Sequence, residues 1–302
     1  MLMKWALVLS GGGAAGLAYI GFFKALEELQ LPKPDCIVGC SMGAIVGGLY
    51  ALGTPVQEME ALFKGPFDIY KYVGGVSTPI FKHTLSTVIQ YGTLLTRMIK
   101  GLGADSGEKT HQFFLELSHG KSFSDCSIPF YCNAFDICSG KEVILESGLL
   151  ADALRASSSY PGLFAPFKCE NALLIDACFV HNTPVWIARK IGYTHILALT
   201  FGSFNPISIE NVDSSLTVLV RTLDCVSAQI KLTGADYPSA ALTFTRQRAA
   251  SDFSNPNEQI AFGYRKTLEE RKTLQTFFAK GLLAPFHRFA LKQKTKKETH
   301  YV

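Results

Sequence analysis

Short apolar runs, each followed by a glycine-rich turn and then by apolar residues at helical spacing, open the chain. Residues 5–9 form the first run, residues 10–16 the turn, and apolar residues then recur at near-helical intervals up to Leu29. A second run ends at Gly39, and residues 44–52 again have a helical pattern. Short apolar runs bounded by turn residues are typical of buried strands. The N-terminal part therefore predicts two strand–turn–helix units of an α/β fold.

The same alternation of strands and helices returns in the middle of the chain. Apolar runs and turn residues predict four more strands, over residues 129–137, 141–146, 172–175 and 195–201. Helices are predicted over residues 149–156 and 184–191, and in the C-terminal third over 214–232 and 259–283. A last short strand is predicted at 242–245. No linker and no internal repeat interrupts this series.

Residues 64–120 depart from the rhythm, because glycines punctuate them and no strand pattern is present. Residues 80–99 favour one or two amphipathic helices, and two interpretations stay open: a lid over a site, or a peripheral helical pair. Residues 101–110 resemble a phosphate-binding loop only superficially. Glu108 separates Gly107 from Lys109, and no strand precedes them.

Composition limits the protein classes. The chain has 302 residues, 48% hydrophobic and 18% charged, which is enough for a large buried core. The net charge of +4 is small and does not favour a nucleic-acid partner. The 8 cysteines lack C-x-x-C or zinc spacing, so we expect reduced thiols, no metal site and a cytoplasmic location. Neither a secretory signal nor an uninterrupted apolar stretch of about 18 residues is visible.

The turn after the second strand carries a candidate nucleophile. Gly39, Ser41 and Gly43 match the G-x-S-x-G pattern, in which a serine occupies a sharp strand-to-helix turn. Glycines on either side let the neighbouring backbone approach closely. The following helix would favour negative charge at the serine. The pattern alone is equally compatible with a simple packing turn.

The first glycine-rich turn has two interpretations. Gly11, Gly13 and Gly16 satisfy G-x-G-x-x-G, the dinucleotide-binding pattern. That pattern requires an acidic residue at the end of the next strand, but Asp35 opens that strand and the serine turn closes it. We therefore favour an oxyanion hole formed by the backbone N–H groups of Gly11, Gly12 and Gly13 beside Ser41, and expect no cofactor.

Asp176 is the second candidate catalytic residue. It follows the apolar run at residues 172–175 directly. The carboxyl end of a strand is where ligands bind in open α/β sheets.

Four sequence blocks in order carry a family resemblance. They are residues 11–16, residues 39–43, residues 156–161 with 164–166, and Asp176-Ala177 followed by residues 182–185. From about residue 5 to 202, the chain resembles bacterial patatin-like phospholipases. The resemblance implies a three-layer α/β/α fold with a central, mostly parallel sheet. It also implies a catalytic domain over residues 5–202 that includes 64–120 as an insertion or lid, with an α-rich extension over 203–302 packed on it.

The resemblance also implies a Ser–Asp dyad without a histidine. Ser41 would be the nucleophile, Asp176 its base, and Gly11, Gly12 and Gly13 the oxyanion hole. The substrate would be a carboxylic ester of a lipid, cleaved through an acyl-enzyme by a phospholipase A, lysophospholipase or esterase reaction. The chain length of the acyl group, the head group and the oligomeric state are not predicted.

One departure and two alternatives bear on this expectation. The family usually has Asp-Gly-Gly or Asp-Gly-Ala where this chain has Asp176-Ala177-Cys178, and a glycine-only backbone at Ala177 would displace Asp176. The chain could then be a catalytically impaired lipid-binding module. A Ser-His-Asp hydrolase would instead use His181 or His195 after Asp176.

The C-terminal region mixes apolar and basic residues. Six large apolar side chains lie among four basic ones: Phe277, Phe278, Leu282, Leu283, Phe286 and Phe289 with Lys280, Arg288, Lys292 and Lys294. Such a stretch is compatible with a peripheral membrane surface, on the inner membrane face. A helix packed on the core with a solvated tail is the alternative.

Overall fold

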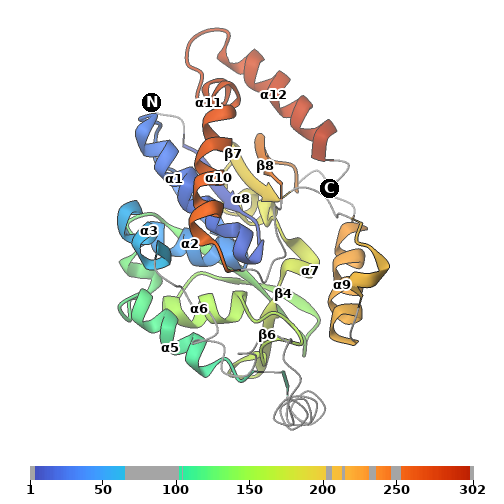
Figure 1. The fold of residues 1–302 in the computed structure, drawn as a ribbon. Coiled ribbons are helices and arrows are strands. Elements are labelled where there is room, and N and C mark those ends of the chain that lie inside the picture. Colours follow the sequence, from blue (N-terminus) through green and yellow to red (C-terminus); the bar gives the residue numbers. More distant parts are fainter. Residues whose placement is uncertain are drawn as a thin grey trace.

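A computed structural model describes residues 4–64, 102–103, 105–201, 206–212, 215–230, 236–245 and 253–299. A central eight-stranded sheet lies between two layers of helices (Figure 1). The helices predicted within residues 80–99 lie outside the described residues.

The strands are β1 (Ala6–Leu9), β2 (Cys36–Gly39), β3 (Phe130–Asp136), β4 (Lys141–Leu145), β5 (Phe167–Cys169), β6 (Ala172–Asp176), β7 (Ile196–Phe201) and β8 (Ala240–Phe244). The α-helices are α1 (Ala18–Glu28), α2 (Met42–Ala51), α3 (Val56–Lys64), α5 (Glu108–Leu117), α6 (Leu150–Ser157), α7 (Cys178–His181), α8 (Val185–Lys190), α9 (Ser215–Ala228), α10 (Pro256–Glu269), α11 (Arg271–Phe277) and α12 (Ala284–Thr299). The described residues also form 3₁₀ turns at η1 (Gly13–Leu17), η3 (Phe123–Asp125) and η4 (Ile209–Asn211).

Alternate residues of the central strands face two separate cores. Leu7 and Leu9 pack into the larger core with α1, α2 and the C-terminal helices α10 and α11. Ala6 and Val8 pack into a smaller core with α8. Strands buried on both faces explain why these runs are apolar at every position. The sheet is mostly parallel, because β3, β2, β1, β7 and β8 all run the same way.

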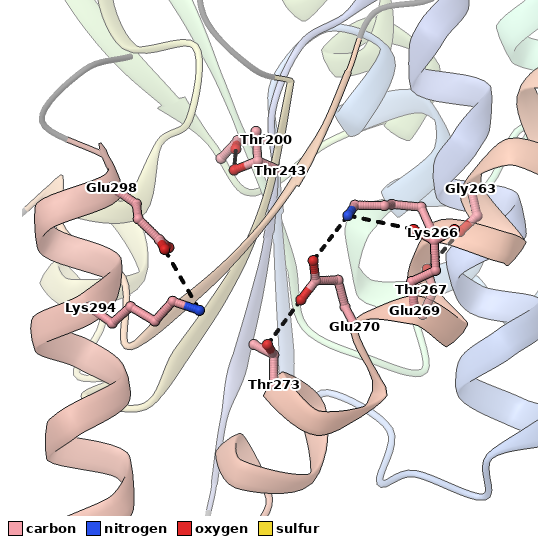
Figure 2. A network of polar contacts seen from close by, with 10 residues as sticks. All are labelled: Thr200, Thr243, Gly263, Lys266, Thr267, Glu269, Glu270, Thr273, Lys294 and Glu298. Carbon is pink, nitrogen blue, oxygen red and sulfur yellow. Dashed lines mark hydrogen bonds and ion pairs between the residues drawn. The ribbon is translucent and has the colours of Figure 1, made fainter.

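The C-terminal helices lie directly against the N-terminal ones. Gly21 of α1 and Gly263 of α10 meet at the crossing, where a Cβ on Gly21 would lie 2.0 Å from the Ile260 carbonyl oxygen. Figure 2 shows polar contacts within the C-terminal helices: Glu270 accepts hydrogen bonds from Lys266 and Thr273 where α10 turns into α11. In the same view a hydrogen bond of 3.2 Å between Thr200 and Thr243 joins β7 to β8.

Strand β6 runs in the opposite direction to the parallel strands of the sheet. It runs antiparallel to β3, so its carboxyl end points against those of β1 and β2. Cys132 of β3 pairs with Gly39 on one edge and with β4 on the other, and Ala134 pairs with Asp176 and with β4. Since β4 occupies one edge of β3 from Cys132 to Asp136, β2 and β6 must share the other edge. The carboxyl ends of β2 and β6 face each other along that edge, which brings Asp176 close to the end of β2.

Four strands or helices of the described residues were not predicted: β5, α5, α7 and α12. Strand β5 has only three residues, two of them exposed, and α7 is a single turn, so neither has a clear apolar period. Helix α12 extends the helical region beyond residue 283, and its lysine-rich end is compatible with a helix because lysine is a good helix former. Within the described residues, no helix has both the length and the hydrophobicity needed to cross a bilayer.

Candidate active site

Ser41 lies at the turn between β2 and α2 in a backbone conformation that side chains rarely adopt. Its φ is 53° and its ψ is −123°. A residue held in such a sparsely populated region costs about 1–3 kcal/mol, and such residues cluster at functional sites. Ser41 is also the N-cap residue of α2, yet its hydroxyl makes no capping hydrogen bond. The hydroxyl is therefore not used to terminate the helix.

The two neighbouring glycines allow this turn by close approach. A Cβ on Gly39 would lie 2.5 Å from the Ala44 Cα, and one on Gly43 would lie 2.4 Å from the Leu9 carbonyl oxygen. Neither contact is sterically possible for a larger residue without movement of the backbone. The first turn of α2 thus packs directly on the ends of β1 and β2, as expected from the pattern.

Asp176 lies beside the same turn and is 1% exposed. Its Oδ1 accepts two hydrogen bonds, one from the Cys178 amide at 2.9 Å and one from the Cys40 thiol at 3.7 Å. Its Oδ2 has no hydrogen-bond partner among the described residues. Burial raises the pKa of Asp176 from 3.8 to about 6, although the Ser41 hydroxyl, the Cys178 amide and the Cys40 thiol favour the charged form. The carboxylate is therefore more basic than an exposed aspartate.

Ala177 does not require a glycine. Its φ is −85° and its ψ is 5°, an ordinary conformation for any L-residue, and its methyl group is fully buried. The departure from the family pattern at this position therefore introduces no backbone strain that would displace Asp176.

The first glycine-rich turn lies against Ser41. A Cβ on Gly11 would be 3.1 Å from the Ser41 Cβ and 2.6 Å from Asn182 Oδ1. The Gly11 amide donates to the Asn182 carbonyl at 3.2 Å, and Asn182 Nδ2 donates back to the Gly11 carbonyl at 3.2 Å. The amides of Gly12 and Gly13 have no acceptor in the described part of the chain. Of the three glycine amides, those two remain available to a ligand.

Neither histidine considered for a triad pairs with Ser41 or Asp176. His181 Nδ1 pairs with Glu142 at 2.6 Å, and this contact raises the pKa of His181. His195 precedes β7 at the opposite, amino end of the strands, where its Nε2 pairs with the Phe277 carbonyl at 3.0 Å. Burial lowers the pKa of His195 to about 4. In the described structure both imidazoles have other partners.

Sequence reasoning missed the residues that hold the two candidates in place. The Ser41 amide donates to Ser157 Oγ at 3.0 Å, and the Asp176 amide donates to the Ser159 carbonyl at 3.0 Å. Both serines belong to the third block of the family resemblance, which carried no assigned role. Their position directly after a predicted helix was the available signal. The end of α6 thus anchors both candidate catalytic residues.

Arg155 supports this anchor from within the core. It is 2% exposed and donates to three backbone carbonyls, those of Ser106, Gly107 and Ala165, and to the Ser159 hydroxyl. Burial lowers its pKa to about 10. A buried guanidinium needs such a full set of acceptors, since removal of partners would leave an uncompensated charge.

Comparison with known proteins gives the family of the chain. The model of the family described as "Patatin-like phospholipase" matches residues 7–189, more than half of the chain. Lysophospholipase NTE1 of Cryptococcus neoformans var. neoformans serotype D (strain JEC21) is 28% identical over 215 residues, which cover 70% of this chain and 12% of that protein. The enzyme of the same name from Candida albicans (strain SC5314) is 30% identical over 211 residues, 70% of this chain and 14% of that protein.

The chain thus spans only a small part of the length of these relatives. Among solved structures, VipD from Legionella pneumophila has a TM-score of 0.49 at 13% identity, covering 98% of this chain and 75% of that one. The match of the family model, together with the order of its sequence blocks, assigns the chain: it belongs to the patatin-like phospholipase family.

Proposed function

We propose that this chain is a serine acyl hydrolase that cleaves carboxylic esters of lipids, with Ser41 as nucleophile and Asp176 as base. One observation carries the proposal. A buried carboxylate with a raised pKa and an unpartnered oxygen lies next to a serine in a strained turn. Perturbed carboxylates and strained residues cluster at functional sites.

In the proposed first step, Asp176 accepts the proton of the Ser41 hydroxyl while Oγ attacks the ester carbonyl. The negative charge that develops on the carbonyl oxygen is stabilised by the N–H groups of Gly12 and Gly13 and by the N-terminus of α2. Gly11 serves as a spacer, because its amide already binds Asn182 and its missing side chain leaves room beside Ser41.

The tetrahedral intermediate then collapses and the C–O bond to the alcohol breaks. The leaving alkoxide takes the proton from Asp176, which leaves the acyl group on Ser41. In the second half, Asp176 deprotonates a water molecule that attacks the acyl-enzyme, and Ser41 regains its proton as the fatty acid departs. A carboxylate needs no third residue to fix a tautomer, so a dyad suffices for this sequence.

The family and the names of the fungal relatives support lipid substrates, and lysophospholipids are the first class to test. Hydrolysis of lysophosphatidylcholine, phosphatidylcholine and a short p-nitrophenyl ester should be compared for wild type, Ser41→Ala and Asp176→Asn. We expect wild type to cleave at least one lipid ester and both variants to lose this activity. His181→Ala serves as the matched control, because this neighbour of the site pairs with Glu142 and should retain activity.

A lipid-binding module without activity is the competing function. A fluorophosphonate reagent separates the two, since it reacts covalently only with an activated serine. Absence of labelling in wild type, together with lipid binding by both wild type and Ser41→Ala, would favour the module.

A further inference from the structure

Helix α9 has an outward face of unusual composition. Its exposed side chains, among those that the structure describes, are Val218, Leu219, Thr222, Cys225 and Val226. None of them is charged, although the solvent-facing side of a surface helix is normally polar and charged. Val218 and Val226 are 52% and 56% exposed. This composition is typical of a helix face that a binding partner covers.

The segment that leads into α9 continues this surface. Ile209 is 82% exposed and Val212 is 39% exposed, and Val212 forms one wall of a shallow groove of about 380 Å³ along α9. Arg221 also lines the groove and supplies a positive charge. Isolated apolar side chains are common on protein surfaces, but a contiguous group of them marks an interaction site.

This surface lies beside the candidate active site. Helix α9 packs on α7, where Ser227 Oγ donates to the Cys178 carbonyl at 3.2 Å. Cys178 in turn donates its amide to Asp176. The chain enters this region from β7, whose last residue, Phe201, contacts the Gly12 backbone so closely that a Cβ there would lie 2.5 Å from its ring. Figure 1 shows α9 next to α7 and away from the layer of α1 and α10.

We propose that the outward face of α9, with Ile209 and Val212, is the surface on which the protein docks to a lipid aggregate. The inference rests on the proposed function, since a lipid ester must leave a bilayer or micelle to reach Ser41. An apolar surface on the helix that packs on α7, next to Asp176, shortens that path.

A second exposed apolar region is the alternative docking surface. Leu282, Leu283, Phe286 and Phe289 are all at least 60% exposed at the start of α12. They follow Phe277, which is fully buried against Trp5 and His195 at the amino ends of β1 and β7. This region therefore lies toward the end of the sheet opposite Ser41, and docking there would turn the site away from the lipid.

The test uses the full chain with Ser41→Ala, so that binding is measured without hydrolysis. Flotation with vesicles of phosphatidylcholine, with and without phosphatidylglycerol, is compared for three proteins. One is the Ser41→Ala parent, one also carries Val218→Ser, Leu219→Ser and Val226→Ser, and the control carries Leu283→Ser, Phe286→Ser and Phe289→Ser. Serine has a helix propensity close to that of valine, and circular dichroism and the melting temperature verify that each variant is folded.

We expect the α9 variant to lose vesicle binding by about tenfold or more, because three apolar side chains no longer leave water, and the α12 variant to bind like the parent. When the three α9 substitutions are made in a protein that keeps Ser41, this protein should lose hydrolysis of vesicle lipid and retain hydrolysis of a water-soluble p-nitrophenyl ester.

Equal binding by the α9 variant and the parent would overturn the proposal, as would loss of binding in the α12 variant alone. The parent could instead form a concentration-dependent dimer that the α9 substitutions dissociate, with vesicle binding unchanged. This result would assign the surface to a second copy of the chain and would also overturn the proposal. If vesicles bind through α9 but no ester is cleaved, the docking surface stands and the proposed hydrolase activity fails.

Discussion

The two ends of the parallel strands differ in what their residues contribute. At the carboxyl ends of β1 and β2, Ser41 has a positive φ and the buried Asp176 has an oxygen without a partner. At the amino ends, Trp5 and His195 pack on Phe277, with the His195 ring stacked at 3.8 Å. The arrangement at the carboxyl ends lowers the free energy of unfolding, and the packing at the amino ends raises it. We therefore expect stability and the proposed chemistry to be separated along the strands. Substitutions at the carboxyl ends should mainly change activity, and substitutions at the amino ends should mainly change stability.

Replacement of Ser41 tests this separation with the largest expected effect. Ser41→Ala and Ser41→Gly should both lower kcat by about 10⁴-fold or more, since the nucleophile is removed. Their stabilities should differ, because glycine adopts a φ of 53° without strain. Urea unfolding should show Ser41→Gly to be more stable than Ser41→Ala by about 1 kcal/mol. Equal stabilities would show that the turn is not strained.

Phe277→Ala tests the opposite end. The ring is fully buried, so its loss should lower the free energy of unfolding by about 3–5 kcal/mol. At a temperature well below the midpoint of unfolding, kcat/KM per folded molecule should stay at the wild-type value. Phe286→Ala is the matched control, because Phe286 is 72% exposed and should change stability by less than about 0.5 kcal/mol. A large change in kcat/KM for Phe277→Ala would show that the two ends are coupled.

Asp176→Asn should stabilise the protein while it abolishes activity. Folding raises the pKa of this carboxyl from 3.8 to about 6, so its ionisation disfavours the folded state. The penalty grows as pH rises from about 4 to 6 and is complete above that range. Thermal unfolding should find the variant more stable by about 1–3 kcal/mol at pH 7, and equal to wild type near pH 4. A variant less stable than wild type at pH 7 would mean that the carboxylate contributes to folding.

Ala177→Gly has the smallest expected effect. The backbone conformation of Ala177 does not require a glycine, so introducing the glycine that the family usually has should not raise kcat/KM. Stability should fall by about 0.5–1 kcal/mol, because glycine loses more backbone entropy on folding. An increase in activity would reveal strain at this residue.

The local parts of the site could be predicted from the sequence. Gly39, Ser41 and Gly43 are close in the chain, and the apolar runs before and after them determine a strand and a helix. The position of Asp176 could not be derived in this way, because it depends on the direction of β6 and on a shared edge of β3. Pairing between distant strands leaves little trace in a single sequence.

The same limit applies to the contacts that refine the proposed mechanism. The bond between the Gly11 amide and Asn182 removes one of three expected oxyanion donors, and it joins residues 171 positions apart. Ser157 and Ser159 were part of a block noted for its order only, yet their hydrogen bonds hold Ser41 and Asp176. Sequence patterns thus predicted the candidate reacting groups, whereas the hydrogen bonds that hold these candidates in place could be identified only from the fold.

Covalent labelling of Ser41 as a function of pH tests the central proposal most directly. Wild type should react with a fluorophosphonate, mass spectrometry should find the adduct on the peptide that contains Ser41, and the rate should rise through an apparent pKa near 6, since only the Asp176 carboxylate accepts the proton. Asp176→Asn should not react at any of these pH values, while His181→Ala should react like wild type. Labelling at another residue, or labelling of Asp176→Asn at the wild-type rate, would contradict the Ser41–Asp176 dyad.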